Sequence, residues 1–422
     1  MDLNDAVKLL RTSQWWTHEQ IEQRQRDCLK RIVLHHAQHT PYFKQRLESQ
    51  GLRAEDVATL EGLKQLKPMT KRDIQQAERF HSEGIPNNHL PIRRSQTSGR
   101  TGEPIAILKT EVNNLWYCAQ TAREHEWWGQ DYSWRLSSIR AIHTDYEESD
   151  RWGSPLAVNS GPTQGIPLKW NVQDQLEKLR AFQPEMLNIH AGVLQAMCAY
   201  WSQHGYDLNL KHIKNTGETL SQEVRQQVKE VTGVTVKDQY SSSEVGLISM
   251  NCEHTDQQHI QVETLLVEIL NEQGQPCQPG ELGRVVITDY YNTVSPMIRY
   301  DIGDYARVGT PCPCGRHSPT LSEIRGRERG LFRRPNGDRF WPTAGQYAAA
   351  EIVKVNQWQL IQHSLDDIEY KIVTDLPLTA EQHDKLLAIF RKNLGFDCVR
   401  ITEYRTQIPT DGKYEESVCL IE

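Results

Sequence analysis

The chain has 422 residues, 24% of which are charged, and its formal net charge at pH 7 is −7. A mildly acidic chain does not attract a polyanion, so nucleic acid is excluded as an expected partner. Residues 1–5 lack the basic start of a signal peptide, and no stretch approaches the roughly 18 apolar residues of a spanning helix, so we expect a cytoplasmic protein with no membrane partner.

Residues 1–90 are predicted to be mostly helical. Apolar residues recur at helical spacing over 21–34 and 42–52, with charged residues between them. From Leu90 onward, short apolar strands alternate with amphipathic helices such as 176–182 and 221–232. This alternation predicts an α/β sheet.

The chain after Arg327 is predicted to form a second, smaller α+β unit. The chain restarts at 339–341, and its expected elements are a helix near 344–355, strands at 358–363 and 368–373, a helix at 380–393 and a strand at 399–404. We therefore expect a large domain over 1–326, with a helical N-terminal region over 1–90, and a small domain over 327–422.

A segment rich in glycine and hydroxyl side chains lies over 95–104 and reads Ser-Gln-Thr-Ser-Gly-Arg-Thr-Gly-Glu-Pro. Glycines allow tight turns, and hydroxyl and N–H groups can surround an anion, so the segment is a candidate phosphate loop. It lacks the Gly-Lys-Ser/Thr ending of the nucleotide loop that opens a helix, and strand-like residues 105–108 follow it. Taken alone, it also fits an ordinary polar hairpin.

This loop resembles the Thr-Ser-Gly-Ser/Thr-Thr-Gly-x-Pro signature of the adenylate-forming enzymes, the superfamily of acyl-CoA synthetases, nonribosomal adenylation domains and luciferases. Arg100 stands where that family usually has serine or threonine. Segments similar to the family's adenine-edge segment, its Tyr-Gly-x-Thr-Glu-x-Gly and Tyr-Arg-Thr-Gly-Asp motifs, its hinge and its catalytic-lysine segment follow in order at 216–218, 240–246, 299–304, 326–327 and 409–413. The short chain, the helical N-terminus and the Cys-Pro-Cys-Gly-Arg segment look most like the phenylacetate-CoA ligase branch, including its relatives near capsule genes.

The resemblance implies an α/β fold with a large N-terminal adenylate-forming domain of mixed sheets and helices and a small mobile C-terminal α+β domain. It also implies that ATP activates a small carboxylic acid, with an aryl acid favoured, as an acyl-adenylate. Pyrophosphate leaves, and the acyl group passes to a thiol acceptor such as CoA.

The same resemblance implies roles for individual residues. Lys413 would neutralise charge between the carboxylate and the α-phosphate, Glu244 would bind Mg²⁺, and Arg327 would brace the ribose or phosphate. Tyr240 would face adenine, and Asp304 would accept hydrogen bonds from the ribose hydroxyls. The implied ATP-binding residues are Thr97, Ser98, Gly99, Arg100, Thr101, Gly102, Gly217, Glu218, Tyr240, Ser243 and Asp304.

The segment after the hinge departs from the family pattern. No aspartate stands near Arg329, and residues 335–338 are typical of a hairpin turn rather than of the lining of a thioester tunnel. The acceptor therefore stays open between CoA, an amine and a carrier-protein thiol. A non-catalytic nucleotide-binding relative is a further alternative. The acid pocket is expected around 139–165 and 188–192, where the residues do not identify the acid.

Five cysteine and histidine residues form a Cys-x-His…His…Cys-x-Cys pattern between 252 and 314. Thiolates and imidazole suit tetrahedral zinc, and four protein ligands would make the site structural. The predicted ligands are Cys252, His259, Cys312 and Cys314, with His254 in reserve. The alternative is a set of buried thiols beside surface histidines.

Overall fold

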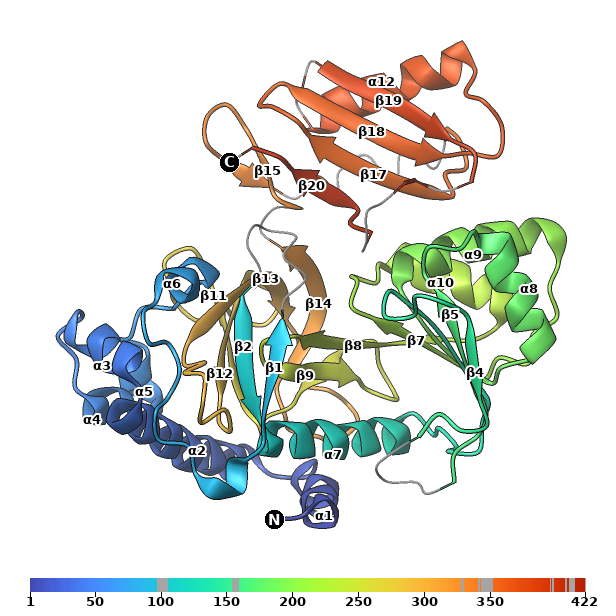
Figure 1. Cartoon of the computed structure of the whole chain (residues 1–422). Coiled ribbons are helices and arrows are strands. Elements are labelled where there is room, and N and C mark those ends of the chain that lie inside the picture. Colours follow the sequence, from blue (N-terminus) through green and yellow to red (C-terminus); the bar gives the residue numbers. More distant parts are fainter. Residues whose placement is uncertain are drawn as a thin grey trace. The chain divides into compact units, whose positions relative to one another are not determined.

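The computed structural model describes residues 1–96, 105–153, 159–327, 330–340, 342, 352–394, 396, 398–406, 408–409 and 414–421. The chain divides into two compact units, whose helices and strands are labelled in Figure 1. The first contains Met1–Asp131 and Asp238–Arg325, and the second contains Tyr132–Gly153, Asn159–Lys237 and Gly326–Glu422. Helices and strands mix in both units, so the predicted α/β class is confirmed. The predicted domain boundary between residues 326 and 327 stays a prediction.

The N-terminal part of the first unit is helical, as predicted. Its helices are α1 (Leu3–Ser13), α2 (His18–His39), α3 (Pro41–Glu48), α4 (Ala54–Val57), α5 (Leu60–Leu63) and α6 (Lys71–Gln76), followed by the 3₁₀ turn η1 (Asn87–His89). Helix α2 is longer than its apolar pattern because Thr17 and Gln20 form a capping box at its start. The helix expected to reach residue 52 ends at Glu48 instead, and Gly51 turns the chain in the left-handed region at φ +66°.

The rest of the first unit consists of strands and one long helix, α7 (Glu111–Trp127). A hairpin is formed by β1 (Ile92–Gln96) and β2 (Ala106–Thr110). The sheet strands are β8 (Val236–Ser242), β9 (Gly246–Asn251), β10 (Gln258–Ile260), β11 (Leu265–Leu270), β12 (Leu282–Asp289), β13 (Tyr300–Val308) and β14 (Thr320–Arg327). They lie in the order β11-β12-β13-β14-β10-β9-β8.

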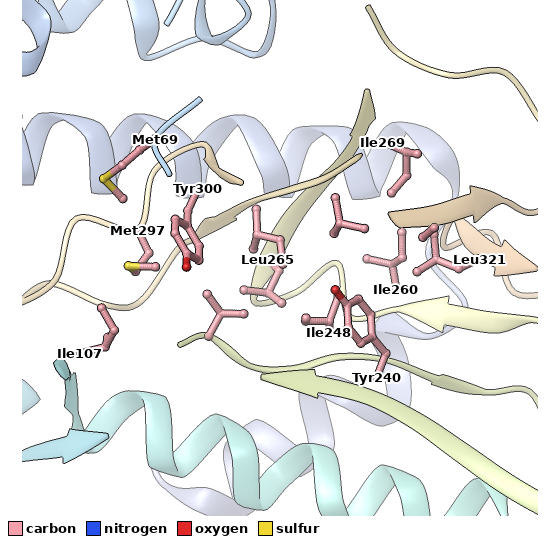
Figure 2. Close-up of a cluster of buried hydrophobic side chains, with 14 of the residues drawn as sticks. Met69, Ile107, Tyr240, Ile248, Ile260, Leu265, Ile269, Met297, Tyr300 and Leu321 are labelled. Atoms are coloured by element: carbon pink, nitrogen blue, oxygen red, sulfur yellow. The ribbon is translucent and has the colours of Figure 1, made fainter. Parts of the chain in front are cut away.

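The core of the first unit joins side chains that are far apart in the sequence. Figure 2 shows Met69, Ile107 and Tyr300 with apolar residues of the sheet. The backbone of Met69 also pairs with the chain at the start of β13, accepting from the Asp301 N–H at 2.8 Å and donating to the Arg299 carbonyl at 2.8 Å. The N-terminal helical region is thereby fixed to the strand that carries Asp304.

The second unit contains the predicted alternation of strands and helices. Its elements up to residue 232 are β3 (Leu136–Arg140), β4 (Glu147–Ser149), β5 (Thr163–Pro167), α8 (Val172–Phe182), β6 (Met186–Ile189), α9 (Ala191–His204), β7 (His212–Thr216) and α10 (Gln222–Thr232). Strands β7, β6, β3 and β5 are parallel neighbours in this order, and β4 is antiparallel at the edge. Apolar residues of α8 and α9 pack on the strands, as expected for parallel strands joined by helices.

The C-terminal part of the second unit is a small α+β structure, as predicted. Its elements are β15 (Phe332–Arg333), β16 (Arg339–Phe340), β17 (Gln357–Gln362), β18 (Asp367–Val373), α12 (Ala380–Leu394), β19 (Cys398–Tyr404) and β20 (Ser417–Cys419). Strands β15 and β16 form the hairpin expected around 335–338, with Gly337 at φ +88°. Of the helix expected near 344–355, residues 343–351 lie outside the described residues, and 352–355 are not helical. Among the described helices, none is long and apolar enough to cross a membrane.

His36, at the buried face of α2, predicts a pH dependence of stability. Its Nε2 donates to the Asn292 carbonyl at 2.9 Å, so its Nδ1 accepts from the Thr40 hydroxyl at 2.7 Å. Burial, with a smaller effect of His35, lowers the pKa of His36 from 6.5 to about 3. The unfolded chain therefore takes up this proton near pH 6.5, whereas the folded chain does so only near pH 3. The stabilisation is complete above pH 6.5 and decreases as the pH falls.

We expect the free energy of unfolding of the wild type to fall by about 2 kcal/mol more than that of His36→Gln between pH 8 and pH 5, since below the pKa of the unfolded chain one proton contributes about 1.4 kcal/mol per pH unit. Urea unfolding of both proteins at the two pH values measures this difference. Equal losses in the two proteins would show that His36 does not carry the effect.

Candidate active site

The hairpin β1–β2 positions the candidate phosphate loop. Gln96 and Ala106 are paired at its end, so residues 97–105 connect the two strands. The loop residues Thr97, Ser98, Gly99, Arg100, Thr101 and Gly102 lie outside the described residues. Just before them, the Ser95 hydroxyl donates to the Ser243 carbonyl at 2.8 Å. The beginning of the loop therefore lies beside the connection between β8 and β9.

That connection carries Glu244, the predicted Mg²⁺ ligand. Its side chain is only 7% exposed, which is unusual for a carboxylate that is simply part of a surface turn. The alternative of an ordinary surface glutamate is therefore disfavoured. Burial lowers the pKa of Lys109 in β2, while the negative charges of Asp289 and Glu244 oppose this shift. A lysine thus lies within electrostatic range of Glu244, a few residues after the loop.

Tyr240 and Asp304 are brought together by the sheet although 64 positions separate them in the sequence. The Tyr240 hydroxyl donates to Asp304 Oδ2 at 2.6 Å. Most of the Tyr240 ring is buried in the core shown in Figure 2. Tyr240 therefore fixes the orientation of a carboxylate, and its contact with adenine stays a prediction.

Arg299, the first residue of the 299–304 segment, has a structural role that the sequence did not reveal. It is buried at φ +52° and donates to the carbonyls of Lys64 and Leu66, each at 2.7 Å. It also forms an ion pair with Glu268 at 3.0 Å. Because a positive φ is uncommon for a residue other than glycine, these contacts must stabilise the conformation. They hold the chain before α6 against the start of β13.

In the second unit, Glu218 connects three segments. Its Oε2 accepts from the Gly192 N–H at 2.9 Å, and its Oε1 accepts from the Tyr414 N–H at 2.6 Å. Its carbonyl accepts from the Asn215 amide at 2.7 Å. A Cβ atom at Gly192 would lie 2.6 Å from the Cβ of Tyr414, so only glycine allows this approach. Residue 414 is thus held at the predicted adenine-edge segment.

The remaining predicted residues are placed only in part. Gly217 precedes Glu218 at φ +74°, a conformation that favours glycine. Arg327 is the last residue of β14, and its side chain lies outside the described residues, as does Lys413. Sequence reasoning missed Lys109 and the Gly192–Glu218–Tyr414 contacts. A signal for Lys109 was present, since it is a charged residue in an otherwise apolar strand.

The four predicted metal ligands do meet. The ligand atoms of Cys252, His259, Cys312 and Cys314 all lie within 4.8 Å of one another, in the first unit. His254 is outside this cluster, with a side chain that is 62% exposed. The alternative of buried thiols beside surface histidines does not fit His259, which is buried, whereas the binding of zinc stays a prediction.

Comparison with known proteins supports the resemblance. No family model matches the chain. A phenylacetate-coenzyme A ligase of Thermus thermophilus is 23% identical over 390 residues, covering 88% of this chain and 85% of the relative. A 2-hydroxyisobutyryl-CoA ligase structure with 2-HIB-AMP, in the postadenylation state, matches with a TM-score of 0.75 and 16% identity, covering 95% and 89% of the two chains.

A more distant structural match is the amide bond synthetase McbA from Marinactinospora thermotolerans, with a TM-score of 0.51 and 14% identity over 73% of this chain and 64% of McbA. The chain therefore resembles phenylacetate-CoA ligases in sequence, and it has the fold of acyl-CoA ligases of the adenylate-forming superfamily. The predicted resemblance is confirmed.

Proposed function

We propose that this chain is an ATP-dependent acid ligase, which activates a small carboxylic acid as an acyl-adenylate and then transfers the acyl group to CoA. The observation that carries the proposal is the contact of the β1–β2 hairpin, through Ser95, with the connection that bears Glu244. The strand end that leads into the segment rich in glycine and hydroxyl groups thus lies beside the connection with a buried carboxylate, and binding of a metal-bound triphosphate requires groups of both kinds. Sequence similarity to phenylacetate-coenzyme A ligases supports the same activity.

The first half-reaction joins two anions, so positive charge must lie close to the reacting atoms. The acid's carboxylate oxygen attacks the α-phosphorus of ATP, and pyrophosphate leaves. We propose that residues 97–102 hold the pyrophosphate end and that Lys413 neutralises the charge that develops at the α-phosphate. Lys109, which lies within electrostatic range of Glu244 in the first unit, is a second lysine available for this role.

Glu244 fits a hard divalent cation, because it is a buried carboxylate in the connection that Ser95 contacts. We propose that Glu244 would hold Mg²⁺ together with phosphate oxygens. Bound there, Mg²⁺ would offset phosphate charge. The cysteine–histidine cluster takes no part in the proposed reaction, because four protein ligands leave a metal no open position for substrate.

For the nucleoside, we propose that Asp304, oriented by Tyr240, accepts hydrogen bonds from the ribose hydroxyls. Gly217 and Glu218 would meet the adenine edge through their backbone, since the Glu218 carboxylate already binds two backbone N–H groups. Arg327 would brace the ribose or phosphate. A cytoplasmic location belongs to the proposal because the reaction consumes ATP.

A second candidate function is amide synthesis, in which an amine replaces CoA. The β15–β16 hairpin favours it, because a tight turn stands where the resemblance implies a thioester tunnel. The structural match to the amide bond synthetase McbA is in keeping with this alternative. The identity of the acid, with an aryl acid proposed first, is common to both candidates.

Pyrophosphate release from ATP tests the proposal. We expect release only when Mg²⁺ and a suitable acid are both present, measured over a panel of aryl and fatty acids. With CoA added, the product should be a thioester, whereas amide formation with added amines alone would favour the second candidate. Nucleotide binding without turnover over the whole panel would instead support a non-catalytic relative.

A further inference from the structure

Cys252, His259, Cys312 and Cys314 come from three separate segments of the first unit. Cys252 follows β9, His259 lies in β10, and the other two cysteines lie in the connection between β13 and β14. Cys252 and His259 are buried, and Cys312 and Cys314 are half-buried. Three sulfur atoms and one imidazole from three chain segments therefore lie close together.

Two of the distances between these ligand atoms are close to those around a tetrahedral zinc ion, and all of them are within 4.8 Å. Zinc lies about 2.3 Å from sulfur and about 2.0–2.1 Å from nitrogen, so its tetrahedral ligands are roughly 3.5–3.8 Å apart. Cys252 Sγ lies 3.7 Å from Cys312 Sγ, and Cys314 Sγ lies 3.3 Å from His259 Nε2. A disulfide would need a sulfur separation of about 2.0 Å, and all four groups are uncrosslinked.

The surrounding hydrogen bonds orient these ligands and suit thiolates. His259 Nδ1 contacts the Ser318 hydroxyl at 2.9 Å, which directs Nε2 toward Cys314. The backbone N–H of His254 donates to Cys252 Sγ, and that of Arg316 donates to Cys314 Sγ, each at 3.5 Å. Backbone donors at sulfur offset the negative charge of a metal-bound thiolate.

One residue links this cluster to the N-terminal helices. Arg316, two positions after Cys314, is buried and donates to Gln14 Oε1 at 3.1 Å, while its guanidinium lies over the rings of Trp15 and Trp127 at 4.9 and 4.0 Å. Trp127 donates to the same Gln14 oxygen at 2.8 Å. The turn after Cys314 therefore packs against the connection between α1 and α2.

We propose that the four residues bind one structural Zn²⁺ and that this ion fixes the 312–318 turn as the support for the α1–α2 connection. The role is independent of the ligase reaction, because all four positions around the metal are taken by protein. Without the ion, three thiols and one imidazole provide little attraction to hold the turn against β9 and β10. The α1–α2 connection would then lose its support at Arg316.

Metal analysis of the purified full chain tests the site. We expect close to one zinc per chain, loss of that zinc in Cys312→Ser/Cys314→Ser, and full retention in the control Cys277→Ser/Cys398→Ser, which changes two cysteines outside the cluster. Cobalt substitution should give thiolate-to-metal charge-transfer absorption in the wild type and in the control, and much less in Cys312→Ser/Cys314→Ser, which has lost two of the three thiolates. Reduced wild-type chain that binds neither zinc nor cobalt would overturn the site.

Hydrogen exchange of the chelated wild type tests the supporting role. Removal of the metal should speed exchange at 11–18 and 312–318 by at least about tenfold and leave α12 unchanged. Arg316→Met should keep its zinc and yet show faster exchange at 11–18. Zinc removal that leaves 11–18 unchanged, or that speeds exchange equally throughout the chain, would overturn this role while the bound zinc would still establish the site.

Discussion

Lys413→Ala is expected to lower acid-dependent pyrophosphate release by about 10²–10³, roughly 3–4 kcal/mol of transition-state stabilisation, because one positive charge is lost where carboxylate and phosphate approach each other. The affinity for ATP should change far less, since the loop, Tyr240 and Asp304 belong to the first unit. Single-turnover release of pyrophosphate at saturating ATP measures the first effect, and nucleotide titration measures the second.

The same variant should still complete the second half-reaction. Supplied with synthetic acyl-adenylate and the true acceptor, it should form product at the wild-type rate, because it begins after the step that needs the lysine. Lys385→Ala is a matched control, as its ammonium is exposed on α12 and paired with Glu381. If Lys413→Ala releases pyrophosphate as fast as this control, Lys413 is a solvated residue and the roles assigned to 409–413 are wrong.

One contact in the second unit supports the importance of this segment. Tyr414, which directly follows Lys413, donates its backbone N–H to Glu218 at 2.6 Å. Gly192 leaves room for this approach. The chain beside the lysine therefore meets the segment that resembles the adenine-edge motif, as a lysine acting on the α-phosphate would need.

Arg123→Met is expected to destabilise the protein by about 3–5 kcal/mol, because it would leave the Glu263 carboxylate as a buried charge without its partner. The two side chains are 5% and 1% exposed and form an ion pair at 2.6 Å. Arg123 also donates to Gln261 and to the Leu10 carbonyl. Burial alone would raise the pKa of Glu263, but Arg123 and the Ser13 hydroxyl outweigh it and lower that pKa, so the carboxylate is ionised at neutral pH.

Two comparisons isolate this buried pair in urea unfolding. Arg11→Ala removes the guanidinium from an exposed ion pair with Glu126, which joins α1 to α7, and should cost no more than about 1 kcal/mol. Arg123→Met/Glu263→Leu should be less destabilised than Arg123→Met, because no lone charge remains. A loss below about 1 kcal/mol for Arg123→Met would contradict the expectation. A double variant that is less stable than Arg123→Met would also contradict it.

Local patterns predicted the helices near 221–232 and 380–393 closely, whereas residues 352–355 of another expected helix are not helical. Two further errors lie at helix ends, where capping decides the boundary. The helix predicted over 176–182 begins at Val172, because Asn171 caps it through the Asp174 N–H at 2.9 Å. Periodicity marks the buried face of a helix, and the first turn contributes little to that face. The apolar pattern therefore understates helix length.

The candidate site was predicted in its residues but not in its contacts. Motif order identified Tyr240 and Asp304, whereas their hydrogen bond depends on a sheet register that no short segment encodes. The ion pair of Arg123 with Glu263 escapes sequence reasoning for the same reason, since 140 positions separate them. The cysteine–histidine cluster was predictable because few residue types can bind zinc, so residue type alone leaves few candidate ligands.

The first unit is built from stretches that are far apart in the sequence, and this affects how the chain folds during synthesis. Met1–Asp131 can complete its core only after Asp238–Arg325 has been synthesised, and at about 5–20 residues per second this delay is roughly 10–40 s. During that time the apolar face of α2 lacks Tyr290 and Ile298, and Trp127 at the end of α7 lacks Leu247 and Met250 of β9. Arg123 also lacks Glu263. The nascent chain thus exposes apolar surface for far longer than a domain of contiguous sequence would. We therefore expect its yield in a cell to depend on chaperones that bind it at the ribosome.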